Sequence, residues 1–372
     1  MGMEIELSTF ERPNPSLMNE AYGETLEKKL SKVQTLGLHS GFFTSTRKPD
    51  VDIHINTHGD MLPLFRDGYS KNNAITYCHF PIAGFLIDSE DKDYLDLLSN
   101  ITLSNIPPET REDFLLKAKD AYRRMTIDST VFTNSEFSRR AIFKVFGVDS
   151  TVLYPPVDTE HFRRAAISSD DRRTDDILVI SRFHRSKKIE NAIHLARLLK
   201  RRNVGRRMVI VGNLSPDGCE YYTLLQKLAK NQDLGDFVKF EPCVSSSRLI
   251  ELMRRSKVYV HPLPGEPFGI STVEAMSAGM IPVVPDIGGH TEFVPQRYQF
   301  HTFGQGVDAV DAALDAPASE RLWMSNRAAS FSDSNFVNRF KRLVADVLEV
   351  AEPSAASQRL VAAQKITKDS LA

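Results

Sequence analysis

The regular alternation of short apolar runs with amphipathic segments in the second half of the chain constrains its fold most strongly. Five runs are bounded by Gly, Pro or polar clusters, as strands are: residues 177–181, 208–212, 237–240, 258–261 and 281–285. The segments between them repeat apolar residues at three- and four-residue steps, as helices do: "IENAIHLARLLKRR", "EYYTLLQKLAKN", "SSRLIELMRR" and "ISTVEAMSAG". This alternation predicts a parallel α/β sheet covered by helices on both faces, which is a doubly wound, Rossmann-like domain.

The first half of the chain repeats the pattern more sparsely. Strands are expected at 3–10, 51–56, 74–79, 129–133 and 151–154, and helices at 17–34, 108–125 and 136–146. Because 372 residues exceed what one hydrophobic core usually fills, we expect two α/β domains. The Pro-anchored, polar stretch 154–176 is typical of a linker between them.

The expected organisation has four parts. They are an amino-terminal Rossmann-like domain over 1–160, a carboxyl-terminal Rossmann-like domain over 165–332, a helix over 333–352 that joins the first domain, and a loosely ordered tail over 353–372. Ligands of doubly wound domains bind beyond the carboxyl ends of the strands. With two such domains, we expect the site in a cleft between them.

Composition excludes several classes of protein. The chain is 41% hydrophobic and 26% charged, it lacks a run of the roughly 18 apolar residues that a membrane span needs, and its start "MGMEIELSTFERP" does not resemble a signal peptide. We therefore expect a cytoplasmic protein. Cys78, Cys219 and Cys243 are odd in number and far apart, so we expect free packing cysteines and neither a disulfide framework nor a zinc site.

The formal net charge of -1 conceals a basic middle region, since Lys and Arg outnumber Asp and Glu by ten within 181–260. Runs such as "KRRNVGRR" at 200–207 are usually solvated helix faces and ends. The alternative is an attractive potential for an anionic ligand. Nucleic acid is the weaker partner, because no aromatic-studded basic motif or known reader module is present.

Three segments that follow predicted strands are candidates for ligand binding. They are "SRFHRSKK" after 177–181, "HPLPGEPFG" after 258–261 and "CHFPIAG" after 74–79. A helix that begins near Gly269 would direct free N–H groups at phosphate oxygens, which Arg182 and Lys187 could neutralise. Glu266 and Glu274, eight residues apart, suit the hydroxyls of a ribose or a sugar ring. Each residue alone is common on protein surfaces or at helix starts, whereas their conjunction is specific.

These segments resemble those of a known family. "EPFGISTVEAMSAGMIPVV" resembles the E-x7-E signature of family-4 retaining glycosyltransferases with the GT-B fold. "SRFHRSKK" is similar to that family's Gly-Arg segment with its following Lys, with Ser181 in the glycine's place, and "VFTNSEFSRRAI" and "VLYPPVDTEHF" are similar as well. The resemblance covers roughly 50–350. Within the family, "YCHFP", "HPLPGEPFGI" and "IPVVPDIGG" look most like the dolichol-pathway α-1,2-mannosyltransferases.

The resemblance implies roles for the candidate residues. Arg182 and Lys187 would hold the donor's diphosphate and stabilise the departing nucleotide without a metal ion. Glu266 would bind hydroxyls of the transferred sugar, and Glu274 those of the ribose. His79 would lie beside the donor sugar, or alternatively end its strand as a histidine satisfied by its own loop.

Further residues would line the donor. The resemblance assigns this role to the backbone amides of Phe268, Gly269, Ile270 and Ser271. Gly212 and Gly288 would let the backbone approach the nucleotide, with plain turn glycines as the alternative. His58 in "NTHGD" is a weaker candidate. "DKD" at 91–93 superficially matches the metal-binding triplet of other transferases, but it does not follow a strand and is expected to be a solvated charge cluster.

One departure from the family concerns the amino-terminal domain, which appears short by about one βα unit because no glycine-rich loop precedes "VDIHINTHGD". A trimmed or misplaced start, an acceptor site built differently, and a chain that keeps the donor site without activity all remain open.

The sequence thus predicts a retaining glycosyltransferase that moves a hexose, mannose by resemblance, from a nucleotide-sugar donor to a glycan or lipid-linked acceptor. GDP-mannose is the expected donor, no other cofactor or metal is expected, and the leaving phosphate is expected to accept the acceptor's proton. A lipid-linked acceptor would bring peripheral contact with the cytoplasmic membrane face. The alternatives are a non-catalytic nucleotide-sugar-binding subunit that needs a partner chain, and a nucleotide-sugar epimerase, which the signature disfavours.

Overall fold

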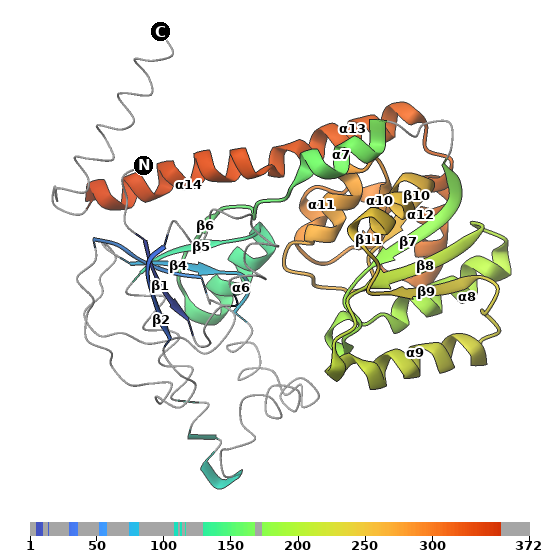
Figure 1. The fold of residues 1–372 in the computed structure, drawn as a ribbon, viewed down its shortest axis with the longest axis horizontal. Helices are drawn as coiled ribbons and strands as arrows, with labels where there is room; N and C mark the ends of the chain where they lie inside the picture. The colour runs from blue at the N-terminus through green and yellow to red at the C-terminus, as the bar shows by residue number, and fades with distance from the viewer. Residues whose placement is uncertain are drawn as a thin grey trace. The chain divides into compact units, whose positions relative to one another are not determined.

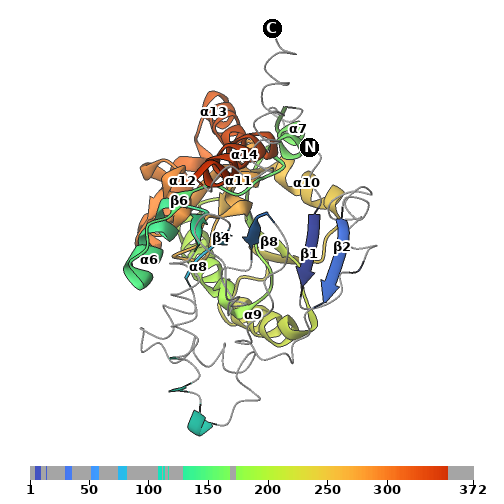
Figure 2. The same ribbon diagram turned by 90° about the vertical axis from the view of Figure 1, so that its left-hand side faces the viewer.

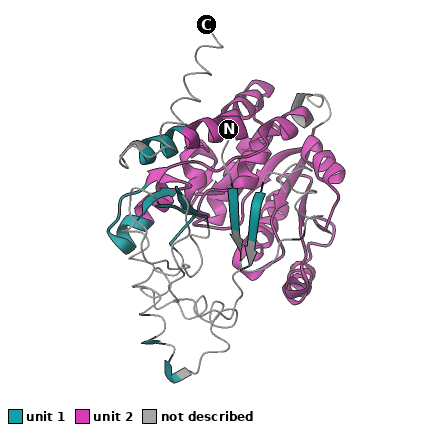
Figure 3. Ribbon diagram, turned by 60° about the vertical axis from the view of Figure 1, so that its left-hand side comes forward, with its two compact units in different colours: residues 1–132, 142–150, 342–372 teal, residues 133–141, 151–341 magenta. Residues whose placement is uncertain are grey.

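The computed structural model describes residues 5–9, 14, 30–35, 52–57, 74–81, 108–110, 112–113, 116, 129–167 and 173–350. The chain divides into two compact units (Figures 1 and 3). Unit 1 comprises residues 1–132, 142–150 and 342–372, and unit 2 comprises 133–141 and 151–341. Each unit is described by itself.

Unit 2 contains a six-stranded sheet in the order β12-β11-β10-β7-β8-β9. Every neighbouring pair in this sheet is parallel. The strands are β7 (Thr174–Ile180), β8 (Arg207–Gly212), β9 (Val238–Pro242), β10 (Ser256–Val260), β11 (Ile281–Pro285) and β12 (Gln299–Phe300). The five strands predicted here are confirmed, and β11 has the predicted bounds.

Both faces of this sheet are buried, because successive side chains of a strand point to opposite faces. Ile177 and Val179 of β7 join one core cluster, while Leu178 between them joins another. Helices cover both faces (Figure 1). They are α8 (Glu190–Arg202), α9 (Cys219–Asn231), α10 (Ser246–Arg255), α11 (Ile270–Ser277), α12 (Phe303–Leu314) and α13 (Ala318–Ala328). The predicted doubly wound parallel α/β architecture is confirmed.

Several elements of unit 2 escaped the sequence prediction. The stretch 154–176, expected to be a linker, contains the helix α7 (Thr159–Ile167) and the start of β7. The linker prediction is therefore wrong over these residues. Asp158 Oδ1 accepts the His161 N–H at 3.1 Å at the start of α7, and Phe162 packs against the second core cluster, so capping and packing stabilise a polar-looking helix. β12, α12 and α13 were also missed.

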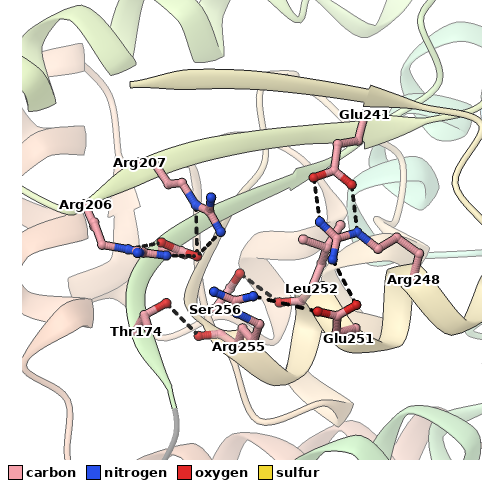
Figure 4. A network of polar contacts seen from close by, with 10 residues as sticks. Thr174, Arg206, Arg207, Glu241, Arg248, Glu251, Leu252, Arg255 and Ser256 are labelled. Atoms are coloured by element: carbon pink, nitrogen blue, oxygen red, sulfur yellow. Dashed lines mark hydrogen bonds and ion pairs between the residues drawn. The ribbon is translucent and has the colours of Figure 1, made fainter. Parts of the chain in front are cut away.

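A buried polar network ties β7 to the neighbouring strand β8. Asp176 is 1% exposed and accepts hydrogen bonds from Arg206 Nε at 2.8 Å and from Arg207 Nε at 3.1 Å. The two guanidinium groups point toward the same carboxylate (Figure 4). Burial by itself would raise the pKa of the Asp176 carboxyl, but the two arginines outweigh it and lower that pKa. Part of the basic middle region is therefore structural.

Unit 1 is described over fewer residues. β1 (Ile5–Thr9) and β2 (Leu30–Thr35) form a parallel pair (Figure 2). The predicted strand at 3–10 is confirmed, whereas the predicted helix at 17–34 is wrong at its end, where β2 lies. Pairing with β1 decides the structure here, because strand formation depends strongly on cross-strand neighbours. Lys32 Nζ lies 3.5 Å from Glu6 Oε2 across the pair.

A second sheet has the order β3-β4-β5-β6. Its strands are β3 (His54–Asn56), β4 (Ala74–Cys78), β5 (Thr130–Thr133) and β6 (Thr151–Val152), each within or close to a predicted range. The helix α6 (Glu136–Phe146) has the predicted bounds. Cys78, Val131, Ile142 and Phe146 form a small core cluster that includes residues of β4, β5 and α6. The long helix α14 (Asp333–Val350) falls within the range predicted for the last helix.

The three cysteines are free, as predicted. Cys78 is buried in the core, but Cys219 and Cys243 are exposed, so the prediction that they are packing residues is wrong. Within the described ranges, no helix is both long and apolar enough to cross a membrane.

The Asp176 network makes a prediction about stability. Asp176→Ala should lower the free energy of unfolding by about 2–3 kcal/mol, less than a fully buried pair, because Arg206 and Arg207 still reach water. Asp308→Ala, which removes an exposed pair with Arg202 at 2.6 Å, should change it little. Urea unfolding of both variants measures the difference. Equal losses in the two variants would show that the buried network has no special weight.

Candidate functional site

The candidate site lies in unit 2, beyond the carboxyl ends of the parallel strands. Arg182 follows β7, and His261 directly follows the neighbouring strand β10. The side chain of Asn191 in α8 donates from Nδ2 to the Pro262 carbonyl at 3.0 Å, which ties the helix after β7 to the loop after β10. The carboxyl ends of adjacent parallel strands are where doubly wound domains bind ligands.

Lys187 is held by a single turn of 3-10 helix, η3 (Arg185–Lys187). His184 caps this turn, since its Nδ1 accepts the Ser186 N–H at 3.2 Å. Lys188 ends the turn in the left-handed region with φ 49°. The turn therefore presents Lys187 at a fixed place after β7.

Lys187 and Glu266 form the central contact of the site. Lys187 Nζ lies 2.9 Å from Glu266 Oε2, and the two side chains are 23% and 15% exposed. His261 Nε2 lies 3.4 Å from the same carboxylate oxygen. Burial by itself would raise the pKa of the Glu266 carboxyl, but His261 and Lys187 outweigh it and hold that pKa well below its usual range. Glu266 is therefore an anion at neutral pH.

The backbone around Glu266 is fixed by two glycines after β11. Gly289 donates its N–H to the Glu266 carbonyl at 2.8 Å. Gly288 has φ 132°, and a Cβ at this position would lie 2.8 Å from the Glu266 carbonyl oxygen. Only glycine fits so close to another backbone without displacement. Gly288 and Gly289 thus allow the Glu266 loop to pack closely against the segment that follows β11.

The helix α11 begins at the site. Gly269 precedes it with φ 99° in the left-handed region, and a Cβ there would meet Thr272 Oγ1 at 3.0 Å. Phe268 is buried and packs on Phe293 and Phe331, which anchors the loop before the helix. Ile270 is exposed. The first N–H groups of α11 have no partner in an earlier turn, as in any helix, and carry the positive end of its dipole.

Glu274 lies one turn into α11 and differs electrostatically from Glu266. Burial raises its pKa from 4.5 to about 7, and its carboxylate makes no hydrogen bond or ion pair within the described part of the chain. Both carboxylates act electrostatically on the buried phenol of Tyr259 and contribute to its raised pKa. An anionic Glu274 needs a partner that donates hydrogen bonds.

The structure brings together most of the predicted donor-site residues. Lys187, Glu266 and Ser271 belong to one cluster of contacts through Tyr259 and His261. Glu274 lies in the same helix as Ser271, one turn further on. Arg182 also follows the carboxyl end of β7, but its side chain is exposed and makes no hydrogen bond or ion pair within the described residues. The roles of all these residues stay predictions.

The other predicted site residues lie elsewhere or are placed for structural reasons. A Cβ on Gly212 would lie 1.9 Å from the Ser181 carbonyl oxygen, so its close approach is to the chain itself. His79 belongs to unit 1, follows β4, and packs edge-on against Tyr77 with ring centroids 4.9 Å apart. Its predicted place beside a donor, like the predicted interdomain cleft, stays a prediction. His58 and residues 91–93 lie outside the described residues.

Three residues of the site were not predicted. His261, Tyr259 and His290 are buried around the Glu266 loop. A signal existed for His261, because it ends the predicted strand 258–261, and doubly wound domains bind ligands beyond the carboxyl ends of their strands. Tyr259 looked like an ordinary strand residue, and His290 follows the two glycines without any pattern of its own.

The environment of Glu274 predicts a pH-dependent stability difference. Because the folded protein binds the Glu274 proton more tightly than the unfolded chain, the contribution of Glu274 to wild-type stability should fall as the pH rises from about 4.5 to about 7. Glu274→Gln removes this loss, so the variant should gain up to about 3 kcal/mol over wild type at pH 8 and little at pH 4. Thermal or urea unfolding from pH 4 to 8 measures it. A difference between the two proteins that is independent of pH would contradict the assignment.

Comparison with known proteins identifies what this arrangement is similar to. Residues 161–319 match the family model described as glycosyl transferases group 1. These residues include the segments that carry Lys187, Glu266 and Glu274. These residues are therefore similar to group 1 glycosyl transferases, which agrees with the resemblance found in the sequence.

Two curated relatives are similar in sequence, and a solved structure is similar in fold. The chain is 28% identical over 218 residues to the GDP-Man:Man(3)GlcNAc(2)-PP-Dol alpha-1,2-mannosyltransferase of Dictyostelium discoideum, covering 54% of this chain and 43% of that protein. It is 28% identical over 335 residues to the enzyme of the same name from Neurospora crassa, covering 78% and 59%. The chain thus spans about half the length of these relatives. Sucrose-phosphate synthase from Thermosynechococcus elongatus has a similar fold, with TM-score 0.55 and 17% identity over 75% of this chain and 68% of that one.

Proposed function

We propose that this chain, whose residues 161–319 match the model of group 1 glycosyl transferases, moves mannose from GDP-mannose to a glycan or lipid-linked acceptor with retention of configuration. The observation that carries the proposal is the contact between Lys187 and Glu266 in the loop before α11, with the unpartnered carboxyl of Glu274 buried one turn into that helix. Both curated relatives carry GDP-mannose and a dolichol-linked glycan in their names, which supports the choice of donor and acceptor.

The diphosphate of the donor fits the cationic side of the site. Lys187 supplies a point charge that is 23% exposed and so can meet a ligand. Arg182 is exposed and follows the same strand, β7, and its planar guanidinium group can bind phosphate through two hydrogen bonds. The free N–H groups at the start of α11 add hydrogen bonds to phosphate oxygens. Together these groups stabilise the negative charge that develops on the departing nucleotide, without requiring a metal ion.

The two carboxylates fit the hydroxyl groups of the donor. Glu266 is ionised and accepts hydrogen bonds from hydroxyls of the transferred sugar. Glu274 accepts hydrogen bonds from the ribose diol, which would supply the partner that its carboxylate lacks within the described residues. The sugar and the ribose flank the diphosphate in a nucleotide sugar, as the two carboxylates flank the start of α11 in sequence.

Retention follows if the acceptor hydroxyl attacks from the side that the nucleotide leaves. The departing phosphate then accepts the acceptor's proton, and no second carboxylate is needed on the opposite face of the sugar. For such a reaction the protein needs to bind the donor, orient the acceptor and stabilise the charge on the leaving group. His79 is proposed to lie beside the donor sugar. A lipid-linked acceptor would bring the enzyme into peripheral contact with a membrane at its cytoplasmic face, which co-sedimentation with anionic liposomes tests.

Substitutions of the cationic and anionic residues of the site should lower the rate of transfer, whereas a control substitution outside the site should not. Lys187→Ala should lower kcat/KM for GDP-mannose by about 100- to 1000-fold, because it removes charge stabilisation of the leaving group. Glu266→Gln should lower kcat/KM as well, with preserved binding of GDP. Lys227→Ala on the exposed face of α9 is the matched control for loss of a positive charge and should leave transfer unchanged. Assays with GDP-, UDP- and ADP-sugars in the presence and absence of EDTA measure these effects.

The outcomes distinguish the candidate functions. Transfer that Lys187→Ala and Glu266→Gln both leave intact would contradict the site. Donor binding without transfer, restored by a partner chain, would replace the proposal with a non-catalytic nucleotide-sugar-binding subunit. Loss of transfer with EDTA would contradict metal independence, and an inverted product would contradict retention.

A further inference from the structure

The buried imidazole of His261 has an unsatisfied nitrogen at the centre of the site. His261 is 4% exposed, and its Nε2 makes no hydrogen bond within the described residues. The Glu266 Oε2 atom lies 3.4 Å from this nitrogen, which is close enough for attraction although the N–H is not aligned with the oxygen. Buried polar atoms in folded proteins nearly always have a hydrogen-bond partner, so this arrangement requires an explanation.

The other nitrogen of His261 belongs to a chain of hydrogen bonds. His261 Nδ1 lies 2.8 Å from Tyr259 Oη, and Tyr259 Oη lies 2.8 Å from Ser271 Oγ. A carboxylate only accepts hydrogen bonds, so an imidazole that serves Glu266 must carry its proton on Nε2. When the ring carries this proton alone, Nδ1 accepts from the Tyr259 hydroxyl, which in turn accepts from Ser271. The chain therefore has one direction, from Ser271 through Tyr259 and His261 to Glu266.

Lys187 and His261 approach the same oxygen of Glu266. Lys187 Nζ is 2.9 Å from Oε2 and satisfies it in this structure. The proposed function, however, also requires Lys187 to neutralise the donor's diphosphate. An ammonium group drawn toward the diphosphate weakens its contact with Glu266, and the carboxylate then needs another internal partner.

We propose that His261 is a positioning residue, which donates from Nε2 to Glu266 when Lys187 turns to the donor's diphosphate and so keeps the carboxylate aimed at the sugar hydroxyls. This inference rests on the proposed function and adds to it. The chain from Ser271 fixes the tautomer and the plane of the imidazole. Ser271 consequently contributes its backbone N–H to the donor, while its hydroxyl serves Tyr259.

The surroundings of Glu266 leave this role to His261. His290 is the other nearby imidazole, with ring centroids 5.3 Å from His261. Its Nε2 lies 2.8 Å from the Pro285 carbonyl oxygen and donates there, and burial lowers its pKa to about 3, so it stays neutral and turned away. Glu274 is a carboxyl group and cannot donate to an ionised Glu266 unless protonated itself. Lys187 is then the competing donor.

Two substitutions separate the two nitrogens of His261. The amide of Gln reaches the position of Nε2, so His261→Gln keeps a donor for Glu266, whereas the amide of Asn reaches the position of Nδ1, so His261→Asn keeps only the contact with Tyr259. Isothermal titration should find GDP binding within about twofold of wild type in both variants. GDP-mannose binding should weaken about 10-fold in His261→Asn and less than about threefold in His261→Gln.

A general structural role for His261 would weaken GDP and GDP-mannose equally, or affect both variants alike, and either result would overturn the inference. A second measurement does not depend on the donor. In a double-mutant cycle by urea unfolding in the Lys187→Ala background, which removes the competing donor, Glu266→Gln should be non-additive with His261→Asn, with a coupling of at least about fivefold in the unfolding constant, and closer to additive with His261→Gln.

The two measurements separate failure of the inference from failure of the proposed function. If the wild-type chain binds neither GDP nor GDP-mannose, the proposed donor is wrong, and the cycle alone decides on the contact between His261 and Glu266. Additive effects within about twofold in the cycle with His261→Asn would remove that contact, and the inference with it.

Discussion

The ion pair between Lys187 and Glu266 is the interaction on which the candidate site depends. It joins residues 79 positions apart in the sequence at 2.9 Å, and it does so because the strands before them, β7 and β10, are parallel neighbours. Removing two opposite charges from water is costly unless both are well paired, so a largely buried pair beyond the carboxyl ends of two strands indicates that the surrounding loops are fixed. Glycines after β11 and the aromatic packing of Phe268 supply that fixation.

Two glutamates of the same signature acquire different properties from their surroundings. Glu266 has two partners of positive or hydrogen-bond-donating character, and its pKa falls well below the usual range. Glu274 is buried without a partner among the described residues, and its pKa rises to about 7. Pairs of carboxyl groups driven apart in pKa commonly divide their tasks in active sites. In the proposed function, one is a permanent anion that addresses the transferred sugar, and the other becomes a stable anion when the ribose satisfies it.

The sequence predicted the doubly wound sheet of unit 2 because its strand and helix periodicities are strong. It also predicted that Lys187 and Glu266 lie together, because motif and strand ends coincided. It did not predict α7, whose polar composition resembles a linker until its Asp158 cap and the packing of Phe162 are known. Nor did it predict β2, which depends on pairing with β1. Tyr259 and His261 were missed because a chain of hydrogen bonds between a strand, a loop and a helix leaves no spacing in the sequence. Gly212 illustrates the reverse case, since its backbone approaches Ser181 rather than requiring a ligand to explain it.

The central claim is that one nucleotide sugar bridges the cation and the two carboxylates around the start of α11. An experimental structure of the chain with bound GDP-mannose tests it most directly. The account predicts diphosphate oxygens within about 3 Å of Lys187 Nζ and of the first N–H groups of α11, the mannose on Glu266 and the ribose on Glu274. A donor bound elsewhere on unit 2, with Lys187 and both glutamates free of it, would contradict the account.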